Sequence, residues 1–223
     1  LHSTSRRQRQ MCIRDRVNTS YGLSLANFIE TLGEEENYKN VIINKNESIA
    51  KISPETLLVI VDTDKRTYVD VPELLKETSK IVIIDHHRRS TDFIDDAMLT
   101  FHEVYASSAA ELVTEIIEYS EVDVKLTELE AEALYAGIMM DTKNFTFKTG
   151  VRTFEAAAYL RKCGVDIITV KKWFQSDLET YNKISKIVAK AEITNDTIAI
   201  AICEEQDKNV NICLLYTSDA ADD

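Results

Sequence analysis

Three aspartates follow apolar segments of the chain and can act together as metal ligands. Asp62 ends LLVIVD, Asp85 ends IVIID and is followed by His86 and His87, and Asp141 ends MMD. Convergence of carboxylates is unfavourable without a cation. Carboxylate with imidazole ligands suits Mn²⁺, Mg²⁺ or Fe²⁺ better than structural zinc, which favours cysteine. The spacing therefore indicates a divalent-metal site.

Each of these residues also has a plain structural explanation. A single aspartate after a strand commonly caps the next helix, which fits Asp62 or Asp85 taken alone. Adjacent histidines on a loop are commonly solvated, and Asp141 can simply end a helix. The joint pattern favours the metal site, because acids follow two separate strands and one of them carries a histidine pair. His102, alone in LTFHEVY, is expected to be a strand or loop residue without a ligand role.

The segments around these residues predict alternating strands and helices. Residues 57–61 and 81–84 are apolar throughout, as in strands buried on both faces of a parallel sheet. Such a sheet brings the carboxyl ends of its strands, and with them Asp62 and Asp85, to one edge. The predicted fold class is α/β, a parallel sheet with helices on both faces. Helices are expected at 18–33, 71–77, 107–119, 127–140, 153–163 and 177–193, and a last strand at 197–203.

Composition restricts what the chain can bind. Its 223 residues are 44% hydrophobic and 29% charged, with 5 Gly and 2 Pro, as in a folded, helix-rich protein. The net charge of −12 opposes binding of long nucleic acid, which needs Lys and Arg to neutralise phosphates. No apolar run approaches the ~18 residues of a membrane-spanning helix, so no membrane contact is expected for this segment. The 4 cysteines lie far apart without a CxxC pair, which suits a reducing compartment.

The two ends of the sequence differ from the rest. Residues 1–16 are rich in arginine and residues 213–223 read CLLYTSDAADD; both resemble translated sequencing-adapter read-through and are expected to be non-native. A flexible native tail is the alternative. The carboxylate-rich motifs stop between Phe174 and Asp177. We therefore expect one domain over 17–193 and the start of a second over 194–212.

Longer strings of sequence connect the candidate metal site with a known family. IDHHRRSTDFI, YASSAAELVTEII and MMDTKNFTFKTGVRTFEAAAYLR resemble, in this order, the DHH phosphoesterase domain of the GdpP-type cyclic-di-AMP phosphodiesterases. The similarity runs from about residue 17 to residue 212. It implies hydrolysis of cyclic-di-AMP to linear pApA through two Mn²⁺ ions. It also implies a homodimer on the cytoplasmic face of a membrane-anchored parent protein.

The resemblance assigns roles to individual residues. Asp62 matches the carboxylate that bridges the two metals, and His86 and Asp141 match further metal ligands. The resemblance also implies two catalytic residues: His87 would approach the substrate phosphate, and Asp85 would orient the histidine loop.

Four more residues are candidates for binding the substrate: Arg88, Arg89, Ser107 and Arg152. Guanidinium groups offer paired donors to phosphate, and a serine at a helix N-terminus can also donate to it. The alternatives are solvated surface arginines, an N-capping role for one of Ser107 and Ser108, and a structural turn around Arg152.

The sequence departs from the family pattern in three respects. It lacks the first metal-binding motif, a histidine followed by D-x-D, and the Gly-rich histidine motif of the downstream domain. Asp64 stands where related chains usually carry histidine. We therefore expect this fragment to hold about half of the metal site and to be inactive or nearly so. The alternatives are a DHH oligoribonuclease or phosphoadenosine phosphate phosphatase, and a cyclic-dinucleotide-binding module without catalysis.

Overall fold

The computed structural model describes residues 23–38, 41–89, 91–122, 124–175, 178–194 and 198–201. The described chain divides into two compact units, one within residues 32–171 and the other formed by the described residues of 23–31 and 172–201. The expected non-native tails at 1–16 and 213–223 lie outside the described residues. All residues of the candidate metal site belong to the first unit.

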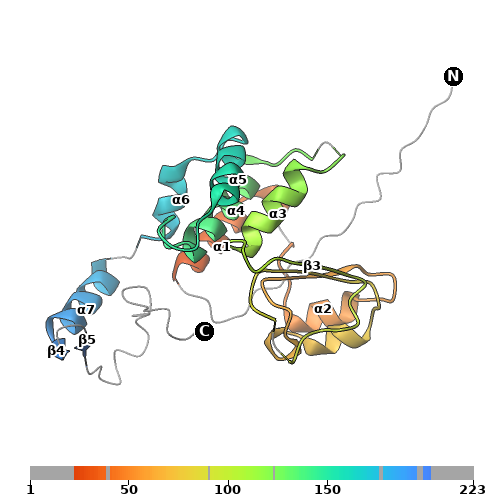
Figure 1. Ribbon diagram of the computed structural model, residues 1–223, viewed down its shortest axis with the longest axis horizontal. Helices are drawn as coiled ribbons and strands as arrows, with labels where there is room; N and C mark the ends of the chain where they lie inside the picture. Colours follow the sequence, from red (N-terminus) through yellow and green to blue (C-terminus); the bar gives the residue numbers. More distant parts are fainter. Residues whose placement is uncertain are drawn as a thin grey trace. The chain divides into compact units, whose positions relative to one another are not determined.

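A three-stranded parallel sheet lies in the first unit (Figure 1). Its strands are β1 (Leu58–Val61), β2 (Ile81–Asp85) and β3 (Leu99–His102), in the spatial order β1-β2-β3. The parallel sheet and the first two strands are confirmed. The third strand was not predicted, because its residues are exposed or only half-buried and show no continuous apolar run. Its register places His102 opposite Asp85.

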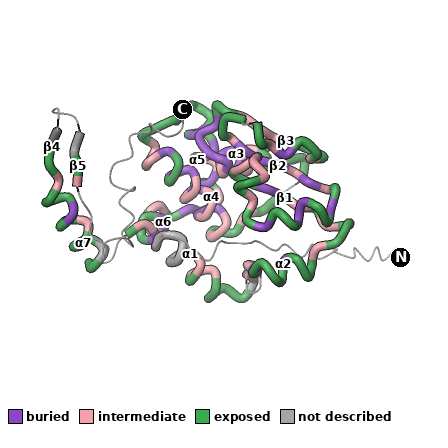
Figure 2. The backbone as a smooth tube through the Cα atoms, turned by 90° about the horizontal axis from the view of Figure 1, so that it is seen from below, coloured by how far each residue is buried: buried purple, intermediate pink, exposed green. Residues whose placement is uncertain are grey.

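Apolar side chains cover both faces of β2, as predicted. On β1, Val59 and Val61 are exposed, so the prediction that residues 57–61 are buried on both faces is wrong. The first cluster joins β1 and β2 to the 3-10 helix η3 (Pro72–Lys76) and the loop before β3: Ile60, Leu75, Ile81, Ile83 and Ile94. The second cluster joins the opposite face to α3 (Ala109–Glu118): Ile84, Ala106 and Leu112. Strand β2 is buried along almost its whole length (Figure 2). Each fully buried side chain of this size contributes roughly 1.5–3 kcal/mol, so β2 is firmly held.

Helices α3, α4 (Glu128–Asp141) and α5 (Val151–Lys162) pack against one another (Figure 1). Two of them begin where capping residues predict. The Ser108 hydroxyl accepts a hydrogen bond from the third residue of α3, and Thr127 and Glu130 form a reciprocal capping box at α4. Helix α5 begins two residues before Thr153, whose side chain instead accepts a hydrogen bond from the backbone N–H of Gly150.

The other helices are short or belong mostly to the second unit. Segment 71–77 forms the 3-10 helix η3 and not an α-helix. The α-helices α2 (Lys45–Lys51) and α6 (Ile167–Trp173) and the 3-10 helices η1 (Glu36–Tyr38) and η2 (Arg66–Tyr68) were not predicted, because seven residues or fewer carry little periodicity. Among the residues that the structure describes, no helix combines the length and the apolar character needed to cross a membrane.

The second unit contains α7 (Leu178–Ala189) and a small antiparallel pair, β4 (Glu192–Thr194) and β5 (Ile198–Ile200). Most of α1 (Leu23–Glu34) also belongs to it. Helices were predicted over both α1 and α7. The predicted helix end at residue 193 is wrong, because the chain pairs as a strand from Glu192 onward.

Candidate metal site

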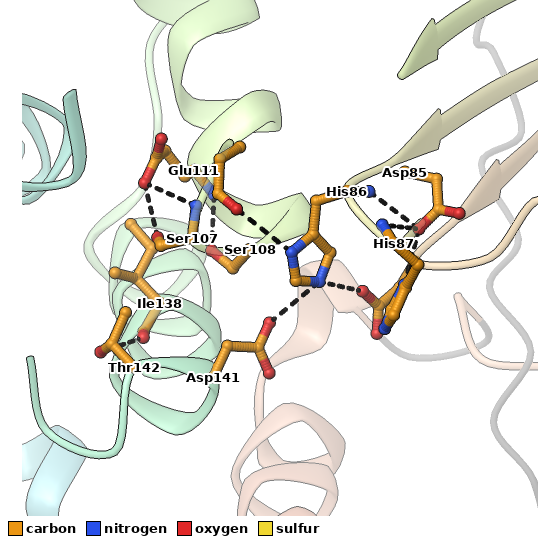
Figure 3. Close-up of polar contacts among 11 residues, drawn as sticks. Asp85, His86, His87, Ser107, Ser108, Glu111, Ile138, Asp141 and Thr142 are labelled. Carbon is orange, nitrogen blue, oxygen red and sulfur yellow. Dashed lines mark hydrogen bonds and ion pairs between the residues drawn. The ribbon is translucent and has the colours of Figure 1, made fainter. Parts of the chain in front are cut away.

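Three elements of the first unit bring Asp62, His86 and Asp141 together. Asp62 follows β1, His86 follows β2, and Asp141 is the last residue of α4. His86 Nε2 lies 3.3 Å from Asp62 Oδ1 and 3.8 Å from Asp141 Oδ2. Figure 3 shows the Asp141 carboxylate directed from the end of α4 toward the His86 ring. One imidazole nitrogen therefore faces two carboxylates that are 79 positions apart in the sequence (141 − 62).

The backbone at Asp62 turns sharply as β1 ends. Its φ of 66° lies in the left-handed region, which costs an L-residue roughly 1–2 kcal/mol. The backbone N–H of Asp62 still donates to the carbonyl of Ile84, so the sheet ladder continues up to the turn. Asp62 caps no described helix, since the next helical turn has Lys65 at its N-cap. The carboxylate is thus left at the sheet edge, available to His86.

Asp85 fixes the histidine loop. It is fully buried, and its Oδ1 accepts hydrogen bonds from the backbone N–H groups of His86 at 2.9 Å and His87 at 3.3 Å. The same oxygen lies 2.8 Å from His87 Nδ1 (Figure 3). Burial opposes ionisation of Asp85, but the hydrogen bonds from His87 and the backbone outweigh it and lower its pKa. The hydrogen bond to Asp85 in turn raises the pKa of His87.

The ring of His86 is oriented by a backbone carbonyl. His86 Nδ1 lies 3.3 Å from the carbonyl oxygen of Ala106. A carbonyl can only accept, so Nδ1 carries the proton and the neutral ring has its lone pair on Nε2. Coordination of a metal through Nε2 needs this tautomer. Burial disfavours the charged ring, but the hydrogen bond to Asp62 and the charge of Asp141 prevail and raise the pKa of His86.

A left-handed turn follows α4 and begins at Lys143, one residue beyond the C-cap Thr142. Lys143, Asn144 and Phe145 all have positive φ, between 47° and 61°. The buried Thr142 holds this turn, because its hydroxyl donates to the Ile138 carbonyl at 2.6 Å and accepts from the Phe145 N–H at 2.9 Å. The helix therefore stops at a defined residue, which fixes the position of the preceding Asp141.

The electrostatics of the group favour a bound cation. The Asp141 side chain is 34% exposed, and its partial burial together with the negative charge of Asp62 raises its pKa to about 6. Asp62, His86 and His87 each offer a ligand atom within 4.8 Å of the others. Oxygen and imidazole donors suit Mn²⁺, Mg²⁺ or Fe²⁺. The assignment of Asp62, His86 and Asp141 as ligands stays a prediction.

The residues predicted to bind substrate differ in their exposure to solvent. Arg88 and Arg89 are exposed beside the histidine pair, and Arg89 Nε lies 3.6 Å from Asp64 Oδ2. Ser107 is buried, and its hydroxyl donates to Glu111 Oε2 (Figure 3). Ser108, and not Ser107, is the N-cap of α3.

Arg152 is engaged by an acidic side chain of α3. Its Nε and Nη2 donate to the two carboxylate oxygens of Glu115, each at 2.7 Å. Glu103 lies farther, 3.9 Å from Arg152 Nη1. The sequence does not reveal this pairing, because Glu115 precedes Arg152 by 37 positions (152 − 115) and no local pattern links them. A role of Arg152 in substrate binding therefore stays a prediction.

Comparison with known families identifies the class of protein. The model of the DHH family, N-terminal domain, matches residues 13–138. The chain belongs to the DHH family, as the motifs around Asp85 and Asp141 predicted.

Particular relatives are considerably longer than the chain. The cyclic-di-AMP phosphodiesterase PdeA of Listeria monocytogenes is 43% identical over 180 residues, which cover 79% of this chain and 27% of the relative. The cyclic-di-AMP phosphodiesterase GdpP of Bacillus subtilis is 42% identical over 180 residues, with the same coverage. A probable bifunctional oligoribonuclease and PAP phosphatase NrnA of Streptococcus mutans is 33% identical over 134 residues, covering 60% of this chain and 40% of that protein. The chain thus spans about a quarter of the length of the first two relatives.

A solved structure supports the fold. An exopolyphosphatase-related protein from Bacteroides fragilis superposes with a TM-score of 0.65, over 88% of this chain and 63% of that chain, at 18% identity. This likeness concerns the arrangement of the backbone alone.

Proposed function

We propose that the chain is the DHH domain of a phosphodiesterase that hydrolyses cyclic-di-AMP to linear pApA. The observation that carries the proposal is the convergence of Asp62, His86 and Asp141 in a chain that is 42–43% identical to cyclic-di-AMP phosphodiesterases. The activity would belong to a longer protein, since the chain spans 27% of these relatives. For the 223-residue chain alone we expect metal binding with little or no turnover.

Asp62, His86 and Asp141 would hold the metal. The metal would be Mn²⁺, with two ions in the complete site, and Asp62 would help to hold both. A bound divalent ion activates water for attack on phosphorus and neutralises charge on the phosphodiester. His86 contributes a fixed tautomer, because the Ala106 carbonyl holds the proton on Nδ1.

His87 would bind the substrate phosphate. Its Nδ1 is held by Asp85, so Nε2 is the nitrogen left for other contacts. Because the hydrogen bond to Asp85 raises the pKa of His87, the ring can carry a positive charge and donate from Nε2 to a phosphate oxygen. Asp85 acts as a positioning residue, through both the ring and the backbone of His87.

The arginines and the remaining partners complete the proposal. Exposed Arg88 and Arg89 would bind phosphate oxygens of the substrate at the mouth of the site. We also propose that the longer protein is a homodimer, anchored in the membrane, with this domain on the cytoplasmic face.

The 33% identity to NrnA supports a second candidate, cleavage of short linear RNA or of phosphoadenosine phosphate. The test uses the longer natural protein with Mn²⁺ and compares cyclic-di-AMP, a short linear RNA and phosphoadenosine phosphate. Preferential hydrolysis of cyclic-di-AMP to pApA supports the proposal. Preferential hydrolysis of either linear substrate contradicts it, and binding of cyclic-di-AMP without turnover indicates a binding module.

A further inference from the structure

A second group of acidic and imidazole side chains lies in the first unit. Asp64, Asp85 and His102 each offer a ligand atom, and these atoms lie within 4.8 Å of one another. The three residues come from the turn after β1 and from the last positions of β2 and β3. They share no member with the group of Asp62, His86 and Asp141. We call them the buried carboxylate cluster.

Three carboxylate oxygens of this cluster accept no hydrogen bond from the described residues. Asp64 is 2% exposed and Asp85 is fully buried. Within the described part of the chain, neither side-chain oxygen of Asp64 accepts a hydrogen bond, and neither does Oδ2 of Asp85. All donors to Asp85 from the histidine loop go to its Oδ1. Buried carboxylates without donors are strongly unfavourable unless a positive charge compensates them.

The neighbouring side chains supply this compensation only in part. Arg89 Nε lies 3.6 Å from Asp64 Oδ2, beyond hydrogen-bond distance, and the Arg89 side chain is half-exposed. Its guanidinium also lies over the Phe93 ring, 5.0 Å from the centroid. His102 Nε2 lies 2.6 Å from the carbonyl oxygen of His87, which requires the proton on Nε2. A neutral His102 ring then has its lone pair on Nδ1, and it is a ligand for a cation instead of a donor to the acids.

We propose that the buried carboxylate cluster binds a divalent cation of the Mn²⁺ or Mg²⁺ class, in addition to the metal held by Asp62, His86 and Asp141. Carboxylate oxygens with one imidazole form a donor set that suits such ions. Ligand atoms roughly 2.0 to 2.6 Å from one ion lie at most about 4 to 5 Å apart, a range that includes the 4.8 Å limit of the cluster.

The ion would act on the histidine loop through Asp85. Asp85 would bind the ion through Oδ2 while its Oδ1 accepts the hydrogen bonds from the histidine loop. The ion would thereby connect this loop to the ends of β1 and β3. Position 64 decides whether the cluster is doubly anionic. A neutral side chain there removes one of the two carboxylates and with it the need for a cation.

The test counts bound Mn²⁺ on the full 223-residue chain by equilibrium dialysis with elemental analysis, and by isothermal titration. Asp64→Asn keeps the shape of the side chain without its charge, and Asp64→His replaces the carboxylate with an imidazole. Asp62→Asn weakens the other site. Asp95→Asn is the matched control, because this exposed carboxylate pairs only with Arg66 among the described residues.

We expect two bound ions per wild-type chain and per Asp95→Asn chain, and one per Asp64→Asn or Asp64→His chain. Asp62→Asn is expected to keep the ion of the buried carboxylate cluster. Equal stoichiometry and affinity in wild type and both Asp64 variants would overturn the proposal and indicate a proton shared between the acids. Because Asp64 variants can fail to fold, a second measurement uses Asp62→Asn alone with labelled histidine. Mn²⁺ must broaden the His102 resonances there, and unbroadened His102 signals also overturn the proposal.

Discussion

Asp85 Oδ1 accepts from His87 twice, from the backbone N–H at 3.3 Å and from ring Nδ1 at 2.8 Å. A single buried oxygen thus fixes both the loop and the ring that the loop carries. Placement of His87 is therefore a property of the strand end, and it does not require a substrate.

Replacing this carboxylate should change the titration of the ring. In Asp85→Asn, without metal, we expect the pKa of His87 to fall, because the hydrogen bond to Asp85 is the main cause that raises it. Because the pKa of His87 is higher in the folded than in the unfolded chain, its interaction with Asp85 stabilises the fold fully at pH values below the unfolded-state pKa. This stabilisation is lost as pH rises through the folded-state pKa. Titration of the imidazole Cε1–H resonances measures the shift. An unchanged His87 pKa would disprove the orienting role of Asp85.

Metal affinity should depend on pH through Asp141. Its pKa is raised to about 6, chiefly by burial, and a ligand must be deprotonated to bind metal. We expect the Mn²⁺ affinity of this site to rise between pH 5 and pH 7, by up to roughly tenfold per pH unit below the pKa. The free energy of unfolding of the metal-free chain should change in the opposite direction. A carboxyl whose pKa is raised in the folded state destabilises the fold as pH rises through that pKa. Asp141→Asn should flatten this part of the pH dependence, and a full pH response in that variant would contradict the assignment.

The packing of α3 on α4 depends on a glycine. A Cβ at Gly137 would lie 2.8 Å from the Ala110 Cβ, closer than two carbons can approach. We expect Gly137→Ala to lower the free energy of unfolding by about 1–3 kcal/mol despite the better helix propensity of alanine. Gly33→Ala is the control, because nothing lies within 4 Å of a Cβ there. Urea denaturation measures both, and Ala110→Gly should restore the stability of Gly137→Ala.

Arg152 links α5 to α3 through Glu115. Its guanidinium makes two hydrogen bonds of 2.7 Å, which lysine cannot reproduce, and the Glu115 side chain is only 15% exposed. We expect Arg152→Lys to lower the free energy of unfolding by about 1 kcal/mol. A double-mutant cycle with Glu115→Gln measures the coupling between the two side chains. Additive effects would show that the pair does not stabilise the domain.

Much of the fold and site could be predicted because the signals are local. Continuous apolar runs identify β1 and β2, and capping residues such as Ser108 and Thr127 mark the helix starts. The proximity of Asp62 and Asp85 could be predicted from the parallel sheet, because such a sheet brings the carboxyl ends of its strands to one edge.

Features that depend on register and long-range packing could not be predicted. Strand β3 is short and half-exposed, so nothing indicated that His102 lies opposite Asp85. The buried carboxylate cluster therefore went unrecognised, although Asp64 was noted as an exception to the family pattern. The partner of Arg152 was equally hidden, because side-chain pairing between helices leaves no periodic trace in a single sequence.

The most direct measurement is Mn²⁺ affinity at the group of Asp62, His86 and Asp141. We would titrate Mn²⁺ by electron paramagnetic resonance into Asp64→Asn chains, so that the buried carboxylate cluster does not contribute, with and without His86→Ala. If His86 is a ligand, the chain with His86→Ala binds Mn²⁺ at least ~10-fold more weakly than the chain that keeps His86. It also loses the nitrogen hyperfine coupling to bound Mn²⁺. Equal affinity and unchanged coupling after removal of the His86 ring would contradict the metal site.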